Sequence, residues 1–499
     1  MQTCLATPEA DSFLVPTTAA TIDVVQGITE DVQWRFVQSP QQSFQIVPVD
    51  NPGKCLANVA GDVELVTVSS SFAETTQFWY LTESQGGYII ENVASHEKLS
   101  VSNQNGALTC TLSDEAQVWT FMDYHVPTEV SMLSSLANPT LYLKNASGKN
   151  YNGEKISVGA DEREDAIEGL PEYLEYCDEN NITGTTKDRG KDEYLAKIYG
   201  DMCAFRVVEA TEGAYRIMPI SSGNGKHRAI AKASSGNEIM LLDNTASSVD
   251  TSRILFVIEL QSDGAYVFKL QSTLDDEDGD VLVLTDNGSG ETVTLTALSE
   301  TGTVLSSQKW MFDTYEYILP DGSTVAYSDM ENYYNSWGFV SPFGNSGHMM
   351  RVTSDFGVRE LNSNPNDFHK GIDLRTKLEN NGSNTIRELY APYGGTVIFA
   401  RNSNYSDAGK CIVIDTGIQA YGAPSYTVCI VYMHMNWVDV SLTSVESGDY
   451  LGTSGTSGTS SPHLHYGIFL KSSDMNATDW NTYPLHPLMF FTPYEFVNG

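Results

Sequence analysis

The last third of this chain contains four histidines and an aspartate whose types and spacing fit a metal site. His369 lies four residues before Asp373, and His463 lies two residues before His465. Side chains at positions i and i+2 of a strand leave the same face, so both histidines of the second pair can enter one cavity. One imidazole of that pair, with His369 and Asp373, would supply three protein ligands and leave the fourth tetrahedral position to water. This is the stoichiometry of a catalytic zinc site rather than a structural one.

The surrounding sequence strengthens this interpretation. The fourth histidine, His434, lies in another strand-like segment, and a glycine-rich run, residues 448–458, leads directly into the strand that carries His463 and His465. No His-Glu-x-x-His helix occurs in the chain, so the glutamate base of thermolysin-like enzymes is missing. If a metal-bound water is the nucleophile, an imidazole, with an unperturbed pKa of ~6.5, must then accept the proton of that water.

Ordered sequence blocks across residues 351–487 resemble the lysostaphin-type zinc metallopeptidases, which cut peptide cross-links of bacterial peptidoglycan. The blocks follow the family order and cover Ser354 to Arg359, His369 to Leu374, Ala391 to Val397, Tyr432 to His434, the glycine-rich run, and Ser461 to His465. The resemblance implies that His369, Asp373 and His465 bind Zn²⁺. It also implies that His434 and His463 stand beside the metal without ligating it and share proton transfer and oxyanion stabilisation. Which of the two is the base stays open.

Three neighbouring residues have two interpretations each. Tyr432 shares the face of His434 if the strand keeps its period of two, so it is a candidate for the substrate groove; the alternative is an aromatic that only packs. Asp355 and Arg359 precede the first ligand in the chain. They either orient that segment through an ion pair or are simply solvated.

The catalytic region, residues 346–499, is expected to be an antiparallel β domain. Its short β-branched runs, Thr396 to Ala400, Cys411 to Asp415 and Val428 to Tyr432, are bounded by Gly, Asn and Ser. The spacing between these runs leaves no room for crossover helices. A sheet of this kind presents a groove in which an extended peptide would meet the metal.

The N-terminal part of the chain contains internal repeats. Trp34, Trp79 and Trp119 recur at spacings of 45 and 40 residues. Trp34 directly follows a glutamine, and the other two follow a glutamine with one residue between. The three units of residues 1–125 resemble the ricin-B-like β-trefoil, in which three tryptophans pack into one core. The whole chain is therefore expected to be all-β.

A second, more diverged β-trefoil-like domain is predicted for residues 126–315. Phe205, Phe256 and Trp310 recur at 51 and 54 residues, and only the last keeps the Gln-x-Trp pattern. An acidic insertion near residues 161–200 is expected to contain a short helix. Residues 316–345, rich in Tyr, Asn, Ser and Gly, are predicted to be a linker into the catalytic domain.

The first β-trefoil domain lacks the residue that would make it a sugar-binding domain. In lectin-competent lobes of that family an aspartate grips a sugar hydroxyl, but this chain has Ala6, Ala57 and Ser100 at those places. A structural spacer or a protein-contact module is the default interpretation, and glycan contact through the N-terminal domains stays open.

Charge limits the partners of the protein. The chain has 499 residues and a net charge of −36, of which residues 346–499 carry 9 basic minus 14 acidic side chains, or −5, so the first 345 carry −31. This balance argues against nucleic acid and against anionic membranes or teichoic acids as electrostatic partners. No apolar run reaches the ~18 residues of a membrane span.

Secretion follows from the expected substrate alone. Peptidoglycan lies outside the cytoplasm, so the protein is expected to be secreted or at the cell surface, with its signal peptide already removed. The seven cysteines are widely scattered; Cys411 and Cys429 fall on strands expected to be neighbours, where a disulfide and free buried thiols are both open.

Two functions therefore stay open. The first is a secreted zinc-dependent endopeptidase that acts on cross-links or stem peptides of peptidoglycan. The second is a non-catalytic cell-wall or glycan-binding protein that retains the peptidase fold. The presence of all five key positions favours the enzyme.

Overall fold

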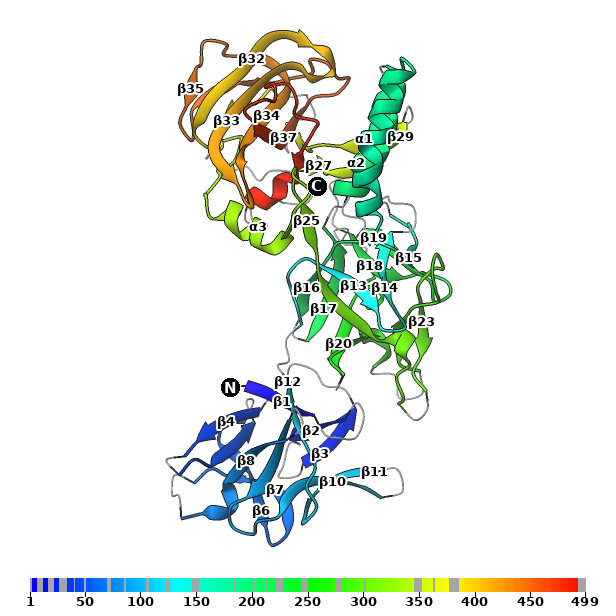
Figure 1. The fold of residues 1–499 in the computed structure, drawn as a ribbon, viewed down its shortest axis with the longest axis vertical. Coiled ribbons are helices and arrows are strands. Elements are labelled where there is room, and N and C mark those ends of the chain that lie inside the picture. The colour runs from blue at the N-terminus through cyan, green and yellow to red at the C-terminus, as the bar shows by residue number, and fades with distance from the viewer. Residues whose placement is uncertain are drawn as a thin grey trace.

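The structure of the protein is a computed structural model with three β-rich units in chain order along its long axis (Figure 1). The N-terminus lies at the first unit and the C-terminus at the third. The structure describes residues 2–6, 12–16, 22–26, 34–39, 41–48, 51–69, 73–84, 87–104, 107–122, 126–145, 152–183, 185–200, 203–211, 213–220, 228–243, 250–261, 263–274, 280–299, 302–344, 352–361, 364–376 and 386–491.

The first unit is built from short antiparallel strands around a tryptophan core. Its strands are β1 (Gln2–Ala6), β2 (Ser12–Pro16), β3 (Ile22–Gln26), β4 (Trp34–Gln38), β5 (Phe44–Pro48), β6 (Lys54–Val59), β7 (Asp62–Thr67), β8 (Trp79–Ser84), β9 (Gly87–Asn92), β10 (Lys98–Gln104), β11 (Ala107–Ser113) and β12 (Thr120–Met122). Trp34, Trp79 and Trp119 are fully buried in one cluster. The repeated tryptophans thus form a shared core, as the sequence predicted.

The Gln-x-Trp pattern has a structural cause. The indole Nε1 of Trp79 donates to the carbonyl of Leu56 at 3.0 Å, and that of Trp119 donates to Leu99 at 2.8 Å. The amide of Gln117 bonds both to the backbone N–H and to the carbonyl of Val101. Trp79 and Trp119 are therefore each tied to the backbone of a neighbouring hairpin, and Gln117 adds a second contact to the hairpin that Trp119 contacts.

The second unit repeats this design with different core residues. Its strands are β13 (Ser131–Ser135), β14 (Asn138–Asn145), β15 (Ile156–Gly159), β16 (Phe205–Thr211), β17 (Ala214–Pro219), β18 (Arg228–Lys232), β19 (Ile239–Asp243), β20 (Phe256–Leu260), β21 (Tyr266–Leu270), β22 (Leu282–Thr285), β23 (Thr294–Ala297) and β24 (Trp310–Thr314). Phe205, Phe256 and Trp310 are buried in one cluster. Trp310 donates from Nε1 to the carbonyl of Leu284 at 3.0 Å, the same contact that Trp79 and Trp119 make.

The acidic insertion of the second unit folds as a helical hairpin. The sequence predicted one short helix, but the structure has two, α1 (Arg163–Glu179) and α2 (Thr185–Tyr199), which follow β15 and precede β16 in the chain. The two helices pack against each other. Cys177 of α1 and Leu195 of α2 are buried. Figure 1 shows the hairpin projecting from the second unit alongside the third.

The third unit is a mixed-length antiparallel sheet, as expected for residues 346–499. Its strands are β27 (Val352–Ser354), β28 (Gly357–Leu361), β29 (Asn364–His369), β30 (Ile372–Arg375), β31 (Glu388–Tyr390), β32 (Gly395–Tyr405), β33 (Gly409–Ala420), β34 (Ala423–Val438), β35 (Ser444–Val445), β36 (Tyr450–Ser454), β37 (His463–Ser472) and β38 (Pro484–Leu485). The main path of the sheet runs β27-β30-β37-β34-β33-β32-β35. The three predicted β-branched runs fall in β32, β33 and β34, which pair side by side.

The segment 316–345 is not a linker in the part that the structure describes. It forms β25 (Glu316–Ile318), β26 (Thr324–Ala326) and α3 (Tyr327–Asn335), and Tyr317, Met330 and Tyr334 are buried in the same core as the strands of the third unit. The prediction was wrong because these aromatic residues pack in the core, whereas composition alone made the segment look like a connection. The Tyr334 ring stacks on Phe490 with centroids 4.4 Å apart.

Short 3₁₀ helices complete the description. They are η1 (Thr75–Gln77), η2 (Thr251–Arg253), η3 (Gln271–Thr273), η4 (Ser306–Gln308), η5 (Ser406–Ala408) and η6 (Pro487–Phe490).

Cys411 and Cys429 are free buried thiols, so the disulfide considered for them is not formed. Among the described residues, no helix has the length and apolar character needed to cross a membrane.

Candidate active site

Three side chains from neighbouring strands bring their metal-binding atoms together. His369 ends β29, Asp373 lies on β30, and His465 faces Asp373 directly across the β30–β37 pair. The His369 Nε2 atom is 2.9 Å from His465 Nδ1, and each of these atoms is 3.2 Å from Asp373 Oδ1. Since these contacts join three possible metal ligands, they define a candidate metal centre.

The spacing of these atoms fits a zinc ion. Zinc–ligand bonds of ~2.0–2.1 Å at tetrahedral angles place neighbouring donor atoms about 3.3 Å apart. The distances of 2.9–3.2 Å between the three donor atoms are close to that value. Two imidazole nitrogens and one carboxylate oxygen are also a donor set that zinc prefers.

Electrostatics favours the metal-binding protonation states of Asp373 and His465. Burial raises the pKa of Asp373, but the adjacent His369 and His465 outweigh it and lower that pKa well below its ordinary value. Burial lowers the pKa of His465 to about 3, against a smaller opposing effect of Asp373. At neutral pH the site therefore offers a carboxylate and a neutral imidazole, the forms that bind a metal ion.

Two residues of the Ser354 to Arg359 block hold the ligands from outside. His369 Nδ1 is 2.8 Å from the carbonyl oxygen of Asp355, so Nδ1 donates and Nε2 is left for the ion. The Arg359 guanidinium donates from Nη1 to Asp373 Oδ2 at 3.2 Å, opposite the oxygen that faces the histidines, and from Nε to Asp367 at 2.5 Å. Arg359 therefore makes ion pairs, as the first of its two interpretations expected, with Asp373 and Asp367. Asp355 contacts His369 through its backbone carbonyl rather than through an ion pair.

The remaining two histidines lie beside the donor atoms. His463 begins β37, and its Nε2 is 3.6 Å from Asp373 Oδ1. The ring centroid of His434 is 4.7 Å from that of His463 and 6.0 Å from that of His465. Between His463 and His465, Leu464 is fully buried, as the period of two predicts.

Both outer histidines have a defined tautomer. The Nδ1 atom of His434 donates to the carbonyl of Ser457 and that of His463 donates to the carbonyl of Ser461, each at 2.9 Å. Each Nε2 is then the nitrogen that can accept a proton. Burial, and next the neighbouring His463, lower the pKa of His434, so its imidazole is neutral at pH 7.

His434 reaches this position through an unusual backbone conformation. Its φ of 61° lies in the left-handed region, which few residues other than glycine adopt. At this residue β34 changes neighbours: Met433 pairs with His465 on β37, whereas Met435 pairs with Ser454 on β36. Strain at such a position is typical of functional sites. The sequence carries no local signal for it.

The same backbone feature overturns the expectation for Tyr432. Because His434 breaks the alternation of β34, the two residues do not share an exposed face. Tyr432 is fully buried, and its hydroxyl donates to the carbonyl of Tyr390 at 2.7 Å. It is a core residue rather than part of a substrate groove.

The glycine-rich run is explained by close backbone approach. A Cβ on Gly455 would lie 2.5 Å from the backbone nitrogen of Asn436, and one on Gly458 would lie 2.5 Å from the carbonyl oxygen of Asp407. Glycines therefore let this run pass close to β34 and to η5, and Ser457 between them accepts from His434 through its carbonyl.

Two protein families match parts of the chain. Residues 367–477 match peptidase family M23, and residues 30–109 match the ricin-type β-trefoil lectin-like domains. The chain therefore contains an M23 peptidase domain, which carries the candidate metal centre, and an N-terminal ricin-B-like domain. Both resemblances seen in the sequence and the all-β class are confirmed. No curated protein matches the chain.

Solved structures similar to this chain include a toxin and two peptidase domains. A mosquitocidal holotoxin is 12% identical with a TM-score of 0.37, and the match covers 93% of this chain and 50% of the toxin, so the chain spans half the length of that protein. The catalytic domain of a prophage-encoded M23 protein from Enterococcus faecalis is 23% identical, with 29% of this chain and 93% of the domain covered and a TM-score of 0.22. The catalytic domain of lysostaphin from Staphylococcus simulans is 20% identical, with coverages of 32% and 96% and a TM-score of 0.20.

Proposed function

We propose that this protein is a secreted, zinc-dependent endopeptidase that hydrolyses peptide cross-links or stem peptides of bacterial peptidoglycan. The observation that carries the proposal is the meeting of His369, Asp373 and His465 within an M23 peptidase domain, with donor atoms 2.9–3.2 Å apart. His434 and His463 stand next to this centre with their Nε2 atoms available.

The geometry supports a division of roles between these five residues. A zinc ion held by His369, Asp373 and His465 would polarise the scissile carbonyl and lower the pKa of water toward ~7. His434 and His463 would move the proton: a neutral Nε2 accepts it from the attacking water, and the resulting imidazolium N–H donates to the oxyanion or to the leaving amine.

The Nδ1 contact of each outer imidazole supports this role. Because the backbone carbonyls of Ser457 and Ser461 accept from Nδ1, each ring keeps one orientation while its Nε2 gains and loses a proton. Groups held in place in this way need no reorganisation during the reaction.

The N-terminal unit is proposed to be a structural spacer or a protein-contact module, and its tryptophans take no part in such a contact. Trp34, Trp79 and Trp119 are fully buried, so they offer no stacking surface to a sugar. Ala57 is buried, and the Ser100 hydroxyl donates to backbone carbonyls of its own unit. Sugar recognition through the usual aspartate is therefore not supported at these two lobes.

The proposal is tested by replacing the first ligand. The His369→Ala variant of the full chain is expected to lose zinc, measured by elemental analysis of the purified protein, and to release no peptide fragments from purified sacculi. Its far-ultraviolet circular dichroism should stay that of the unaltered chain. A His96→Ala variant serves as control, because His96 is an exposed histidine in the first unit.

Undiminished cleavage by His369→Ala would contradict the proposal. Zinc binding by the unaltered chain without any hydrolysis would favour the alternative, a non-catalytic wall-binding protein that retains the peptidase fold. Mass spectrometry of fragments released from walls of known cross-link type would identify the bond that is cut.

A further inference from the structure

The helical hairpin belongs to the second unit by sequence but packs against the strands that carry the metal ligands. Helix α2 contacts β28 and β29, the hairpin that ends at His369. Leu195 and Tyr199 of α2 are buried in one continuous core with Ile372 and Leu374 of β30. Figure 1 shows the two helices next to β29.

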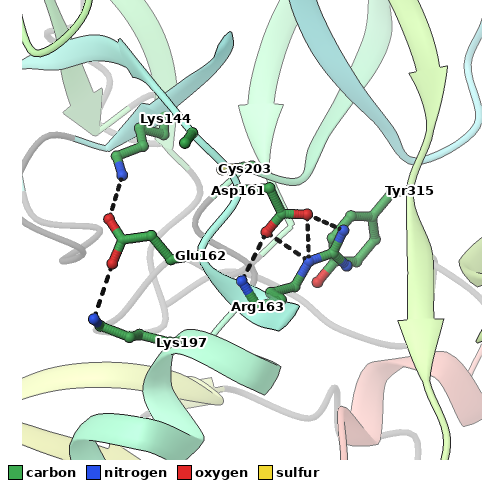
Figure 2. Close-up of a pocket in the computed structure, with 8 residues that line it drawn as sticks. Lys144, Asp161, Glu162, Arg163, Lys197, Cys203 and Tyr315 are labelled. Carbon is green, nitrogen blue, oxygen red and sulfur yellow. Dashed lines mark hydrogen bonds and ion pairs between the residues drawn. The ribbon is translucent and has the colours of Figure 1, made fainter. Parts of the chain in front are cut away.

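The base of the hairpin is fixed to the strand that enters the third unit. Arg163, the first residue of α1, pairs with Asp161 through Nε–Oδ1 at 3.0 Å and Nη2–Oδ2 at 2.6 Å, and its guanidinium lies 4.4 Å from the Tyr315 ring centroid (Figure 2). Its Nη1 donates to the carbonyl of Glu316, which begins β25. A planar, bidentate contact of this kind restrains orientation as well as distance.

A second set of contacts joins both helices to the sheet of the second unit. Figure 2 shows Glu162 between two lysines: Oε1 accepts from Lys144 of β14 at 3.2 Å and Oε2 accepts from Lys197 of α2 at 2.9 Å. The start of α1 and the end of α2 are therefore held together on the second unit. These contacts fix the orientation of the helical hairpin relative to the sheet of the second unit.

On its flank, α2 makes an ion pair with the residue that follows the first metal ligand. Asp192 Oδ1 is 2.5 Å from the Nζ of Lys370, and both side chains are largely buried. Burial raises the pKa of Asp192, and the positive charge of Lys370 opposes that rise. A buried charge that loses its partner is costly, so this contact strongly favours one position of Lys370.

The backbone between His369 and Asp373 cannot absorb a displacement of Lys370. A Cβ on Gly371 would lie 2.7 Å from His465 Nε2 and 2.7 Å from the carbonyl oxygen of Tyr466, so this residue already abuts the strand of the third ligand. A shift of Lys370 is therefore passed on to the ligands on either side of it. Metal sites respond to such shifts because they require geometry within about 0.5 Å.

We propose that Asp192 is a positioning residue of the metal centre, supplied by the second unit: its ion pair with Lys370 holds the segment from His369 to Asp373 in the geometry that brings the three ligand atoms together. The inference rests on the proposed metal site. On this proposal the helical hairpin of the second unit helps to position the metal ligands, all of which lie in the third unit.

The test compares Asp192→Asn with the unaltered full chain. The variant is isosteric and leaves Lys370 without its charged partner, so we expect zinc affinity to fall about 10–100-fold, as for other residues that orient metal ligands, measured by competition with a chromophoric chelator. The visible spectrum of the cobalt-substituted protein should change as well, because it reports ligand geometry. In the metal-free protein, amide hydrogen exchange of residues 368–373 should accelerate.

The matched control is Asp178→Asn. Asp178 pairs with Lys187 within the same helical hairpin, but its side chain is 74% exposed and the pair faces solvent. This variant should keep the zinc affinity, the cobalt spectrum and the exchange rates of the unaltered chain. The double variant Asp192→Asn with Lys370→Gln should regain most of the lost affinity, because it leaves no buried charge unpaired.

Unchanged zinc affinity and unchanged exchange in Asp192→Asn would overturn the inference. Should that variant fail to fold, Asp192→Glu carries the test: it keeps the charge but lengthens the side chain, so it should fold and alter the cobalt spectrum, and an unaltered spectrum with unaltered affinity would overturn the inference equally. Absence of hydrolysis with these differences present would refute the proposed function alone, because exchange and metal affinity need no turnover.

Discussion

Asp373 and His465 are paired residues on the antiparallel strands β30 and β37, and their ligand atoms Oδ1 and Nδ1 are 3.2 Å apart. Direct cross-strand partners lie with side chains on one face at short Cβ distances. Two of the three candidate metal ligands are therefore set by the register of a single strand pair. The third, His369, ends β29, and Gly371 between β29 and β30 lies against the strand that carries His465.

Arg359 should control metal affinity. Arg359→Gln removes the contact from Nη1 to Asp373 Oδ2 and the ion pair with Asp367, so zinc affinity is expected to fall about 10–100-fold without loss of a ligand. Chelator competition measures this change. Arg401→Gln, at an exposed position of β32 whose Nε bonds only locally to Ser403, is the control and should bind zinc normally.

His434 should be needed for turnover but not for zinc. His434→Gln is expected to lower kcat by about 10²–10⁴-fold, the usual loss on removing a general acid or base. Zinc content should stay the same, because the three ligand atoms come from other residues. Fragment release from sacculi and elemental analysis measure the two quantities on one preparation. Loss of zinc together with activity would show that His434 is a ligand after all.

The two outer histidines should act as one unit. His463 and His434 have ring centroids 4.7 Å apart, so removing either one disturbs the other. We expect the double variant His434→Gln with His463→Gln to be little slower than the slower single variant, since residues that share one proton-transfer step are not additive. If the fold-loss in kcat of the double variant equals the product of the two single fold-losses, the two histidines have independent roles.

Activity should persist below the ordinary titration range of histidine. Burial, and next the neighbouring His463, lower the pKa of His434, so its neutral form survives to a pH below ~6.5. A base with a lowered pKa loses activity only as pH falls through that lowered value. The acid limb of the pH profile of kcat/KM is therefore expected below pH ~6.5. An acid limb above that value would show that His434 is not the base.

The tryptophan core of the first unit should dominate its stability. Trp79→Ala removes a fully buried ring and its 3.0 Å hydrogen bond to Leu56, so a destabilisation of about 3–5 kcal/mol is expected for the unfolding transition of this unit. Trp437→Ala, at a residue that is 40% exposed, should change stability far less. Denaturant unfolding followed by circular dichroism compares the two. Peptidase activity should survive Trp79→Ala, because that residue lies in another unit.

The sequence by itself determined the elements that depend on local periodicity. Strand alternation places His463 and His465 on one side of β37 with Leu464 buried between them, and the repeated tryptophans mark the core of the first unit. These features need only the period of a strand and the burial of large apolar rings. His369 and Asp373 were proposed from their types and spacing, and the family resemblance selected His465 as the third member of the candidate metal centre.

Only the tertiary structure decided the features that depend on contacts between distant segments. The left-handed φ of His434 occurs where the pairing partner of β34 changes from β37 to β36. As a result, Tyr432 does not lie in the site. Residues 316–344 became part of the core through packing that composition does not reveal. The contact between Asp192 and Lys370 joins residues 178 positions apart, a pairing that neither residue's local sequence specifies, because long-range partners are chosen by the packing of whole elements.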